Sequence, residues 1–440
     1  MKHIHVLALL CATAFTFFHA SARKPNFVYI MVDDAGYGDF SCFGQKRFKT
    51  PNVDRMATEG MKLTDFYAAS TVCAPSRCSL MTGVHTGHAL VRGNREVQPE
   101  GQAPLPASAL TLPEVLGKVG YVSGMFGKWG LGSPGSEGDP MNQGFDRFYG
   151  YNCQRQAHNF YPTHLWSDRS KVELNRKSYS HSLIAEECLK FIRKNKDKPF
   201  FAMLSFYSVH TPLIGRPDLV AKYKKKAASI NGAEFGDEEM TWPKNGKTRK
   251  VRILQKHAVY AAMVEAMDLA VGKVLDKLES LGLDDDVVVA FTSDNGGLST
   301  SEGSPTSNLP LRGGKGWVYE GGIREPFIVR WPGVTKAGSV NAEPVMSTDF
   351  FPTFVKAAGS KPSGAGPIDG VDLMPSLKGG TLERDALYWH YPHYSNQGGF
   401  PGGAIRMGKW KMIERYEDGA VQLYDLSEDV SEHTDLSKVH

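Results

Sequence analysis

The stretch FVYIMVDD, residues 27–34, joins six consecutive apolar or aromatic residues to two aspartates. An unbroken apolar run of this length predicts a strand that is covered on both faces of a sheet. Three further short runs are rich in β-branched and aromatic residues and also end in polar turns: residues 121–126, 200–207 and 287–292. Helical patterns separate them, over residues 53–59, 112–119, 182–194 and 256–281. The alternation predicts an α/β fold, with a mainly parallel or mixed central sheet sandwiched by helices.

Ionisable or amide side chains follow each of the four apolar runs. They are Asp33 and Asp34 after the first, Lys128 after the second, His210 after the third, and Asp294 and Asn295 after the fourth. In open α/β sheets, ligands bind outside the carboxyl ends of the strands. The sequence therefore predicts that these residues share one site at that edge of the sheet.

The C-terminal part of the chain has a different pattern. Residues 404–413 and 421–424 flank a polar turn at Glu417 to Gly419, which predicts a β-hairpin. We therefore divide the chain into a large α/β domain over residues 23–374 and a small antiparallel α+β subdomain over residues 375–440. The polar residues 227–250 are predicted to form an exposed insertion near the active-site rim or a disordered excursion.

The first 22 residues form a predicted signal peptide. Lys2 and His3 precede an apolar run over residues 4–18, and an A-x-A pattern at residues 20–22 marks a cleavage site before Arg23. The run is shorter than the roughly 20 residues that span a bilayer, and no later segment is long and apolar enough. We expect a secreted or periplasmic protein without a membrane anchor.

Net charge and cysteine content exclude two further classes of protein. The formal net charge of +4 is too small to indicate binding to nucleic acid. Five cysteines follow the leader, at positions 42, 73, 78, 153 and 188, which is too few for a disulfide scaffold. With Cys73 set aside, the other four could form up to two bridges or remain buried free thiols.

The most specific motif is CAPSRCSLMTG, residues 73–83. It resembles the signature of the type I sulfatases, the arylsulfatase-like and formylglycine-dependent branch of the alkaline phosphatase superfamily. The resemblance implies that a dedicated maturation enzyme oxidises Cys73 to formylglycine, whose hydrated aldehyde attacks sulfur. Pro75 and Ser76 indicate a helix start, so residue 73 is predicted near the positive end of a helix dipole.

The resemblance extends over almost the whole mature chain and implies a metal site. Residues 24–38, 50–57 and 291–296 are similar to the family's N-terminal metal loop, its next shared segment and its second metal loop. Carried over, Asp33, Asp34, Asp294 and Asn295 bind Ca²⁺, with modified Cys73 close by. These side chains offer the hard oxygen donors that calcium prefers.

The same matching implies the residues that handle the sulfate group. Lys128 and Lys315 resemble the family's two sulfate-clamping lysines, and Arg77 is expected to hold the nucleophile in position. His210 resembles the histidine that protonates the leaving alcohol, which is general-acid chemistry suited to imidazole. Preplaced cations stabilise the negative charge that develops in the transition state.

The chain departs from the family pattern in two places. The common form G-K-W-H-L-G is replaced by GKWGLG at residues 127–132, so Gly130 stands where a histidine is usual. We predict that His158 or His164 takes over its role as the base that assists aldehyde regeneration, or that substrate or water fills the gap. The chain also ends soon after residues 423–426, where relatives continue with a further helix, which suggests a truncated C-terminal subdomain.

The expected substrate is a sulfated carbohydrate. Residues 160–166 and 388–394 are rich in aromatic residues and histidine, which could stack on sugar rings or pack in the core. We assign His158, His164 and His393 to substrate binding, and the resemblance to bacterial polysaccharide sulfatases points to 4-sulfated galactose or N-acetylgalactosamine. Two alternatives stay open: a phosphomonoester or phosphonate hydrolase of the same superfamily, and a sulfated-glycan-binding protein without turnover if Cys73 stays a thiol.

Overall fold

A large mixed sheet forms the centre of the protein. The computed structural model describes residues 24–241, 248–361 and 366–439, so the predicted signal peptide lies outside the described residues. Within them, eleven strands form one sheet in the order β12-β2-β11-β10-β1-β7-β3-β4-β5-β6, with β13 also paired to β2. The strands are β1 (Asn26–Val32), β2 (Met61–Tyr67), β3 (Val122–Lys128), β4 (Arg147–Tyr151), β5 (His164–Ser167), β6 (Ser170–Glu173), β7 (Phe200–Ser205), β10 (Val287–Ser293), β11 (Arg324–Arg330), β12 (Ser339–Asn341) and β13 (Val345–Met346).

The four predicted strands lie side by side in the middle of this sheet. β10, β1, β7 and β3 are consecutive neighbours, and every pairing among them is parallel. β11 runs antiparallel to both β10 and β2, so β2 points the same way as the central strands. The carboxyl ends of all five strands therefore meet at one edge of the sheet, as the strand-end pattern predicts.

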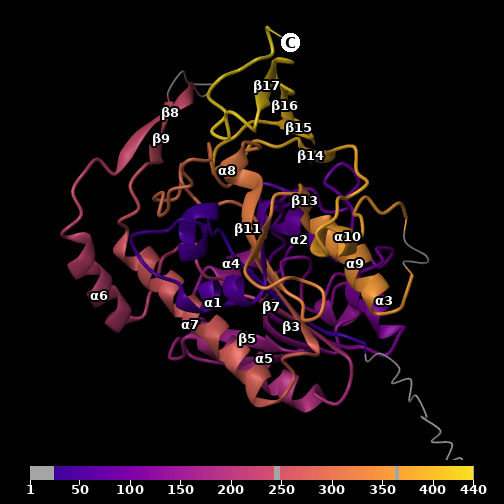
Figure 1. The fold of residues 1–440 in the computed structure, drawn as a ribbon. Helices are drawn as coiled ribbons and strands as arrows, with labels where there is room; N and C mark the ends of the chain where they lie inside the picture. The colour runs from indigo at the N-terminus through magenta and orange to yellow at the C-terminus, as the bar shows by residue number, and fades with distance from the viewer. Residues whose placement is uncertain (1–23, 242–247, 362–365, 440) are drawn as a thin grey trace, which may run out of the picture.

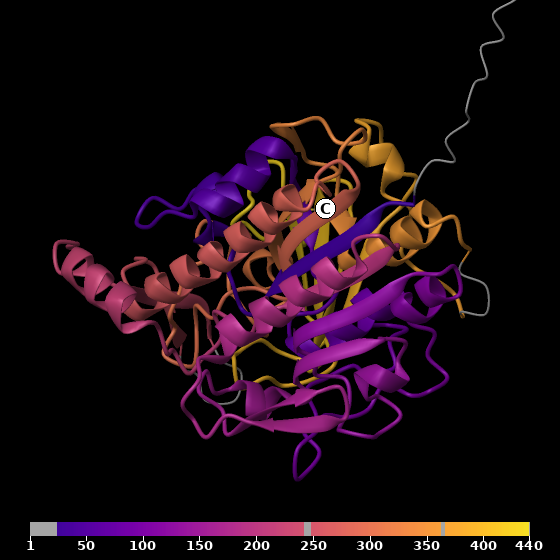
Figure 2. The ribbon, with the colours of Figure 1, turned by 90° about the horizontal axis from the view of Figure 1, so that it is seen from below.

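Helices cover both faces of the sheet. α1 (Pro51–Glu59), α5 (Ser180–Asn195) and α7 (Ala258–Ser280) pack on one face, with α5 and α7 beside each other in Figures 1 and 2. α2 (Cys73–Thr82), α3 (Leu112–Gly117) and α9 (Phe350–Ala357) pack on the other. This arrangement confirms the predicted α/β sandwich, and the four predicted helices are all present. The remaining helices are α4 (Gln154–Ala157), α6 (Pro217–Ala227), α8 (Glu320–Ile323) and α10 (Met374–Leu377).

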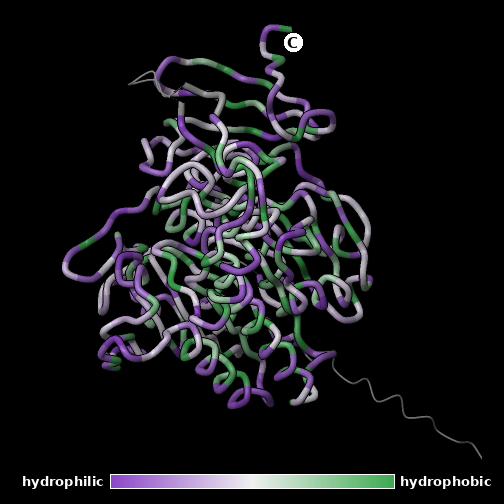
Figure 3. The backbone as a smooth tube through the Cα atoms, turned by 90° about the vertical axis from the view of Figure 1, so that its left-hand side faces the viewer, coloured by the Kyte–Doolittle hydropathy of each residue, from purple (hydrophilic) through white to green (hydrophobic). Residues whose placement is uncertain are grey.

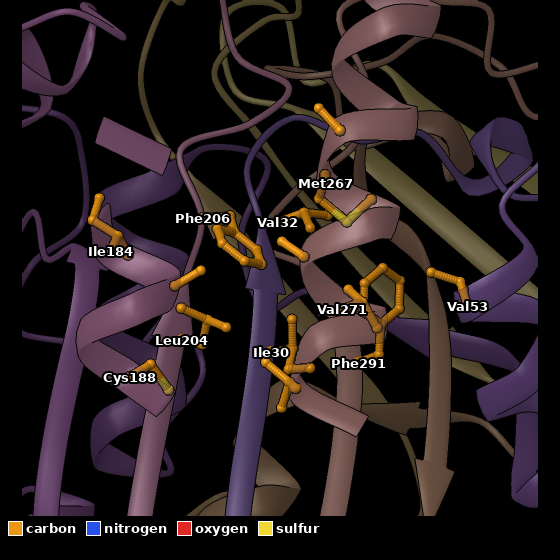
Figure 4. Packing of buried hydrophobic residues seen from close by; sticks show 14 of the residues in the cluster. Ile30, Val32, Val53, Ile184, Cys188, Leu204, Phe206, Met267, Val271 and Phe291 are labelled. Atoms are coloured by element: carbon orange, nitrogen blue, oxygen red, sulfur yellow. The ribbon is translucent and has the colours of Figure 1, made fainter. Parts of the chain in front are cut away.

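The alternation of side chains along β1 explains why the strand is apolar throughout. Val28, Ile30 and Val32 belong to the core under α5 and α7, whereas Phe27, Tyr29 and Met31 belong to the core under α2, α3 and α9. Figure 4 shows part of the first core, where strand residues Ile30, Val32, Leu204 and Phe291, with Phe206 just after β7, meet Met267 and Val271 of α7 and Ile184 and Cys188 of α5. Hydrophobic segments accordingly concentrate in the interior of the molecule, and hydrophilic ones on the outer loops (Figure 3).

A four-stranded antiparallel sheet lies at the C-terminal end of the chain (Figure 1). Its strands are β14 (Leu387–Tyr391), β15 (Gly402–Met407), β16 (Trp410–Arg415) and β17 (Val421–Asp425). The predicted turn at residues 417–419 does separate two of them. However, residues 404–413 are two strands and not one, because the chain reverses at Gly408, which has a φ of 58°.

Three further expectations concern the polar stretch 227–250, the cysteines and membrane-spanning helices. Part of the polar stretch 227–250 is ordered as the two-stranded ribbon of β8 (Phe235–Thr241) and β9 (Thr248–Arg252). All five cysteines of the described residues are free thiols, which resolves the open choice against bridges. Among the described helices, none combines the length and the apolar character needed to cross a bilayer.

Candidate active site

Cys73 is the first residue of α2 and lies at the carboxyl edge of the sheet. The helix follows β2 after a short connection, Val72 is its N-cap, and all ten of its residues are buried. Cys73 itself is 1% exposed. The side chain therefore sits where the positive end of the helix dipole favours negative charge, although the helix begins two residues earlier than Pro75 suggests.

Parallel pairing brings the two acidic loops together. β1 and β10 are in register with Val32 opposite Ser293, so Asp33 and Asp294 leave the sheet side by side. The Asn295 amide donates to Asp34 Oδ1 at 2.8 Å, and Asp34 N–H donates to Asp294 Oδ1 at 3.3 Å. Cys73 Sγ lies 3.6 Å from Asp33 Oδ1. Two loops that are 260 residues apart in sequence thus form one buried cluster with residue 73.

Two cations hold this cluster from the side of β3. Lys128, the last residue of β3, places Nζ 2.5 Å from Asp33 Oδ2. The Arg77 guanidinium donates to Asp294 Oδ2 at 2.7 Å and to the Lys128 carbonyl at 2.6 Å, and it also bonds Ser205 Oγ at 2.6 Å. Since both cations are fully buried, each needs these partners to offset its desolvation.

Lys315 and His210 complete the opposite side. Lys315 Nζ lies 2.8 Å from Asp34 Oδ2 and 2.9 Å from His210 Nε2. His210 Nδ1 is 2.5 Å from the Thr211 carbonyl oxygen, which can only accept a hydrogen bond. This assigns the proton to Nδ1 and leaves Nε2 to accept a hydrogen bond from Lys315.

Burial and the crowding of carboxylates shift the acidity of the cluster. Burial raises the pKa of Asp34 to about 6 against the opposing Lys315, and burial with Asp33 raises the pKa of Asp294 to about 6. Burial also acts to raise the pKa of Asp33, but Lys128, His210 and Arg77 outweigh it and lower that pKa. Burial, which disfavours a charged carboxylate, is the largest cause of both raised values.

The unmodified thiol of Cys73 is a weak nucleophile in this environment. Burial raises its pKa to about 12, although Lys128 and Lys315 act in the other direction. The thiolate and not the thiol is the reactive form of cysteine.

The three histidines assigned to substrate binding end up in different places. His158, just after α4, stacks on His210 with ring centroids 4.6 Å apart, and burial followed by His210 lowers its pKa to about 3. His164 Nε2 lies 3.0 Å from Glu100, and its Nδ1 lies 3.0 Å from Thr163 Oγ1. Among the described residues, no contact joins His164 to the catalytic cluster, so of these two histidines only His158 contacts that cluster, through His210. His393 lies on a separate loop beside Gly93.

The space next to Gly130 is taken by an amide that the sequence reading missed. Gly130 has a φ of 80°, and a Cβ there would lie 3.6 Å from Arg77 Cδ and from Gln154 Cγ and Nε2. The Gln154 amide donates to Asn94 Oδ1 at 3.1 Å, and Asn94 Oδ1 also accepts from Ala74 N–H at 2.9 Å. The left-handed backbone favours glycine, and Gln154 and Asn94 line the flank of residue 73. The position of Gln154 four residues before His158 was the one signal available.

Comparisons with known proteins agree with this geometry. A family model described as sulfatase matches residues 25–360, and one described as N-sulphoglucosamine sulphohydrolase, C-terminal, matches residues 314–439. N-acetylgalactosamine-6-sulfatase of Mus musculus is 33% identical over 392 residues, covering 83% of this chain and 69% of that protein. Arylsulfatase A of Homo sapiens is 32% identical over 429 residues, covering 89% of this chain and 75% of that protein.

Solved structures show the same likeness. The structure of Ps i-CgsB in complex with k-i-k-neocarrahexaose superposes with a TM-score of 0.79 at 28% identity, over 95% of this chain and 89% of that one. The phosphonate monoester hydrolase of Agrobacterium radiobacter shares the fold, with a TM-score of 0.67 at 20% identity, over 94% of this chain and 92% of that one. Because the sulfatase model matches well over half of the residues and the curated relatives agree, the chain belongs to the sulfatase family and is a sulfuric ester hydrolase.

Proposed function

We propose that this sulfatase hydrolyses sulfate monoesters on a sulfated carbohydrate, with formylglycine made from Cys73 as its nucleophile and with bound Ca²⁺. The observation that carries the proposal is the convergence at Cys73 of buried carboxylates on one side and buried cations on the other, with Sγ 3.6 Å from Asp33. An enzyme that cleaves an anionic ester needs such cations beside its nucleophile.

The residues around Cys73 fit a divalent cation. Asp33, Asp34 and Asp294 supply carboxylate oxygens, and Asn295 Oδ1 is buried without a hydrogen-bond partner among the described residues. A buried carbonyl oxygen without a donor is costly unless a ligand satisfies it. Four hard oxygen donors favour Ca²⁺ over softer metals. When bound, the ion would supply positive charge to the nucleophile and to a sulfate oxygen.

Residue 73 would act as an oxygen nucleophile once formylglycine replaces the cysteine, since the aldehyde hydrate supplies the attacking hydroxyl. The hydrogen bond from Ala74 N–H to Asn94 fixes the first turn of α2 beside it. Arg77 ties that helix to β3, β7 and the loop after β10 through its three partners. We assign to Arg77 the positioning of residue 73 and of Asp294.

Lys128 and Lys315 are proposed to clamp the sulfate group. Their ammonium groups approach from opposite sides and now contact Asp33 and Asp34 respectively. Both would stabilise the charge that develops on the sulfuryl oxygens. His210 would act as the general acid: its Nε2 accepts a hydrogen bond from Lys315 in this arrangement, so it must first take up a proton from solvent, which it then donates to the leaving alcohol.

A carbohydrate is the substrate class that the surroundings support best. His158 stacks on His210 at the mouth of the cluster, and Tyr391 and His393 line a nearby cavity. A relative at 33% identity is named for N-acetylgalactosamine 6-sulfate, and one at 28% identity holds a neocarrahexaose. We propose a sulfated galactose or N-acetylgalactosamine, with the 4-sulfate as the first regioisomer to test and the 6-sulfate as its comparison.

Hydrolysis of phosphate monoesters or phosphonates is proposed as a side activity. The fold is shared with a phosphonate monoester hydrolase, and a phosphate monoester offers the same oxygens with about one more negative charge near neutral pH. The predicted leader supports export to the periplasm or the medium, and a maturation enzyme for Cys73 is the implied protein partner.

Two measurements test the proposal. Mass analysis of the tryptic peptide that contains residue 73 should show formylglycine when the protein is produced with a maturation enzyme. Release of sulfate from 4- and 6-sulfated galactose and N-acetylgalactosamine should then be lost in Cys73→Ala. Substantial turnover by Cys73→Ala would contradict the assigned nucleophile, and an unmodified thiol without turnover would favour the glycan-binding alternative.

A further inference from the structure

A cavity of about 570 Å³ opens beside the catalytic cluster. Residues 90–95 and 103–104 form one wall. Tyr391, the last residue of β14 in the C-terminal sheet, and residues 393–397 after it form the other. A volume in this range accommodates a ligand of one or two sugar rings. None of the proposed catalytic residues lines this cavity.

Direct contacts connect the cavity walls to the reacting groups. Asn94 of the first wall accepts a hydrogen bond from Ala74 N–H, which is the residue after Cys73. In the second wall, Ser395 packs so closely on Gly316 that a Cβ there would lie 2.6 Å from Ser395 Oγ, and Gly316 follows Lys315. A substrate bound with its sulfate between the lysines would therefore extend into this cavity.

The cavity has an uncompensated positive charge. Arg92 and Arg95 line it together with His393, and no Asp or Glu is among its lining residues. Arg92 bonds the carbonyl oxygens of Gly87 and Ala89, each at 3.0 Å. Within the part of the chain that the structure describes, neither arginine forms an ion pair with a carboxylate.

Among the described residues, two carboxylates contact these walls and both are already engaged: Glu417 is hydrogen-bonded to Tyr394 of the second wall. Glu302 accepts from Thr211 Oγ1 at 2.7 Å and from the Gln397 side chain at 2.5 Å, so its charge is directed at the back of the second wall. The whole chain carries a net charge of only +4. Two arginines without an ion pair among the described residues are thus a local feature of this cavity, and both are exposed, so an anion bound there can reach them.

From this arrangement we propose that the cavity is a subsite for a second anionic group of the substrate, held by Arg92 and Arg95, on the sugar next to the one that carries the scissile sulfate. The subsite rests on the proposed function, and it makes the preferred substrate a polyanionic glycan and not a singly sulfated sugar. Guanidinium groups bind sulfate and carboxylate in the same forked geometry, so the second group is either a sulfate or a uronate carboxylate.

The test uses three disaccharides that share the scissile sulfated sugar. Their neighbouring sugar is neutral, carries a second sulfate, or is a uronate. For the wild-type enzyme, kcat/KM should be higher on one or both charged disaccharides than on the neutral one, and the charged sugar that gives the gain identifies the group. Arg95→Ala should lower the ratio of charged to neutral kcat/KM by about 10- to 100-fold, the range expected for one charge-assisted contact. Arg95→Glu should lower it further.

Arg193→Ala is the matched control, because Arg193 is exposed near the end of α5, which leads into the start of β7 at the opposite edge of the sheet. It should leave the ratio unchanged. Equal kcat/KM on all three disaccharides, or a ratio that Arg95→Ala does not change, would overturn the subsite.

A binding measurement separates this inference from the proposed function. Calorimetric titration of Cys73→Ala protein with each of the two charged disaccharides should show, for at least one of them, about 10-fold or greater loss of affinity when Arg95→Ala is added. If the wild-type enzyme releases sulfate from none of the esters, the proposed function fails, yet this titration still decides for or against the subsite.

Discussion

A buried ion triad joins the C-terminal sheet to the catalytic part of the chain, and its lysine offers a sharp test. Lys411 of β16 contacts Glu320, the first residue of α8, at 2.9 Å and Glu432 at 2.7 Å. All three side chains are fully buried. Glu320 lies five residues after Lys315, so the triad anchors the segment that leads out of the catalytic cluster. We consider Lys411→Met, which keeps the volume and removes the charge.

The expected loss follows from the two carboxylates that the substitution would leave behind. Burial already raises the pKa of Glu432 to about 7 against the opposing Lys411, so loss of the lysine raises it further. At pH 8 the variant must bury an unpaired charge or bind a proton, which costs about 3–5 kcal/mol of unfolding free energy. A raised pKa destabilises only above the unfolded value of about 4.5, so the loss should fall below half of that at pH 5.

Urea unfolding at pH 8 and pH 5, followed by tryptophan fluorescence, measures both values. Lys409→Met is the matched control: Lys409 contacts Asp425 at 2.5 Å in the same sheet, but its side chain is 52% exposed, and an exposed pair contributes less than about 1 kcal/mol. Adding Glu432→Gln to Lys411→Met should restore part of the stability at pH 8. A Lys411→Met protein that is no less stable than Lys409→Met at pH 8, or a loss that is equal at both pH values, would refute the reasoning.

Three further predictions concern the catalytic cluster and its surroundings. Complete removal of Ca²⁺, checked by elemental analysis, should lower turnover at least about 100-fold and lower the melting temperature, because the acidic side chains lose their counter-charge. Asp294→Ala should have the same two effects. Unchanged kinetics in metal-free protein would exclude a role for the metal in turnover. In single-turnover experiments, His158→Ala should release alcohol in one burst and then stall with sulfate retained on residue 73. The His164→Ala variant should turn over normally, because His164 is bound to Glu100. Normal turnover of His158→Ala would show that His158 is not the base. Glu325 is fully buried, its two carboxylate oxygens lack partners among the described residues, and burial raises its pKa well above 4.5. Glu325→Gln should therefore raise the unfolding free energy by about 2–4 kcal/mol at pH 8 and by almost nothing near pH 4.5. Equal stabilities of the two proteins at pH 8 would show that the carboxyl group has a partner that offsets its burial.

The sequence predicts the sheet edge well because the relevant signals are local. The runs that become β1, β7 and β10 are almost wholly apolar, and the run that becomes β3 is interrupted only by Ser123 and Gly124. Such apolar character is what a strand buried on both faces requires. Once these strands are parallel neighbours, the residues after them must converge. The grouping of Asp33, Lys128 and Asp294 is therefore a consequence of strand order, which explains why their meeting could be predicted from residues far apart in the chain.

The flank of residue 73 could not be predicted, because it depends on how loops pack. His158 and His164 are six residues apart in one histidine-rich stretch, yet β5 begins at His164 and directs it to Glu100, while His158 follows α4 and stacks on His210. Asn94 carries no sequence signal for a role next to residue 73, and Gln154 has only its position four residues before His158. Their hydrogen bond forms between segments 60 residues apart, neither of which is a regular strand.

The pairing of charges in the cluster has a consequence for how its two ligands would bind. Lys128 and Lys315 form their ion pairs with Asp33 and Asp34, which are also the carboxylates proposed to hold Ca²⁺. A carboxylate that binds the ion has less charge to offer to a lysine, so each lysine becomes more available to a sulfate group. A sulfate that occupies the lysines leaves the carboxylates more available to the ion. Binding of the two should therefore be cooperative, and by linkage each must tighten the other by the same factor.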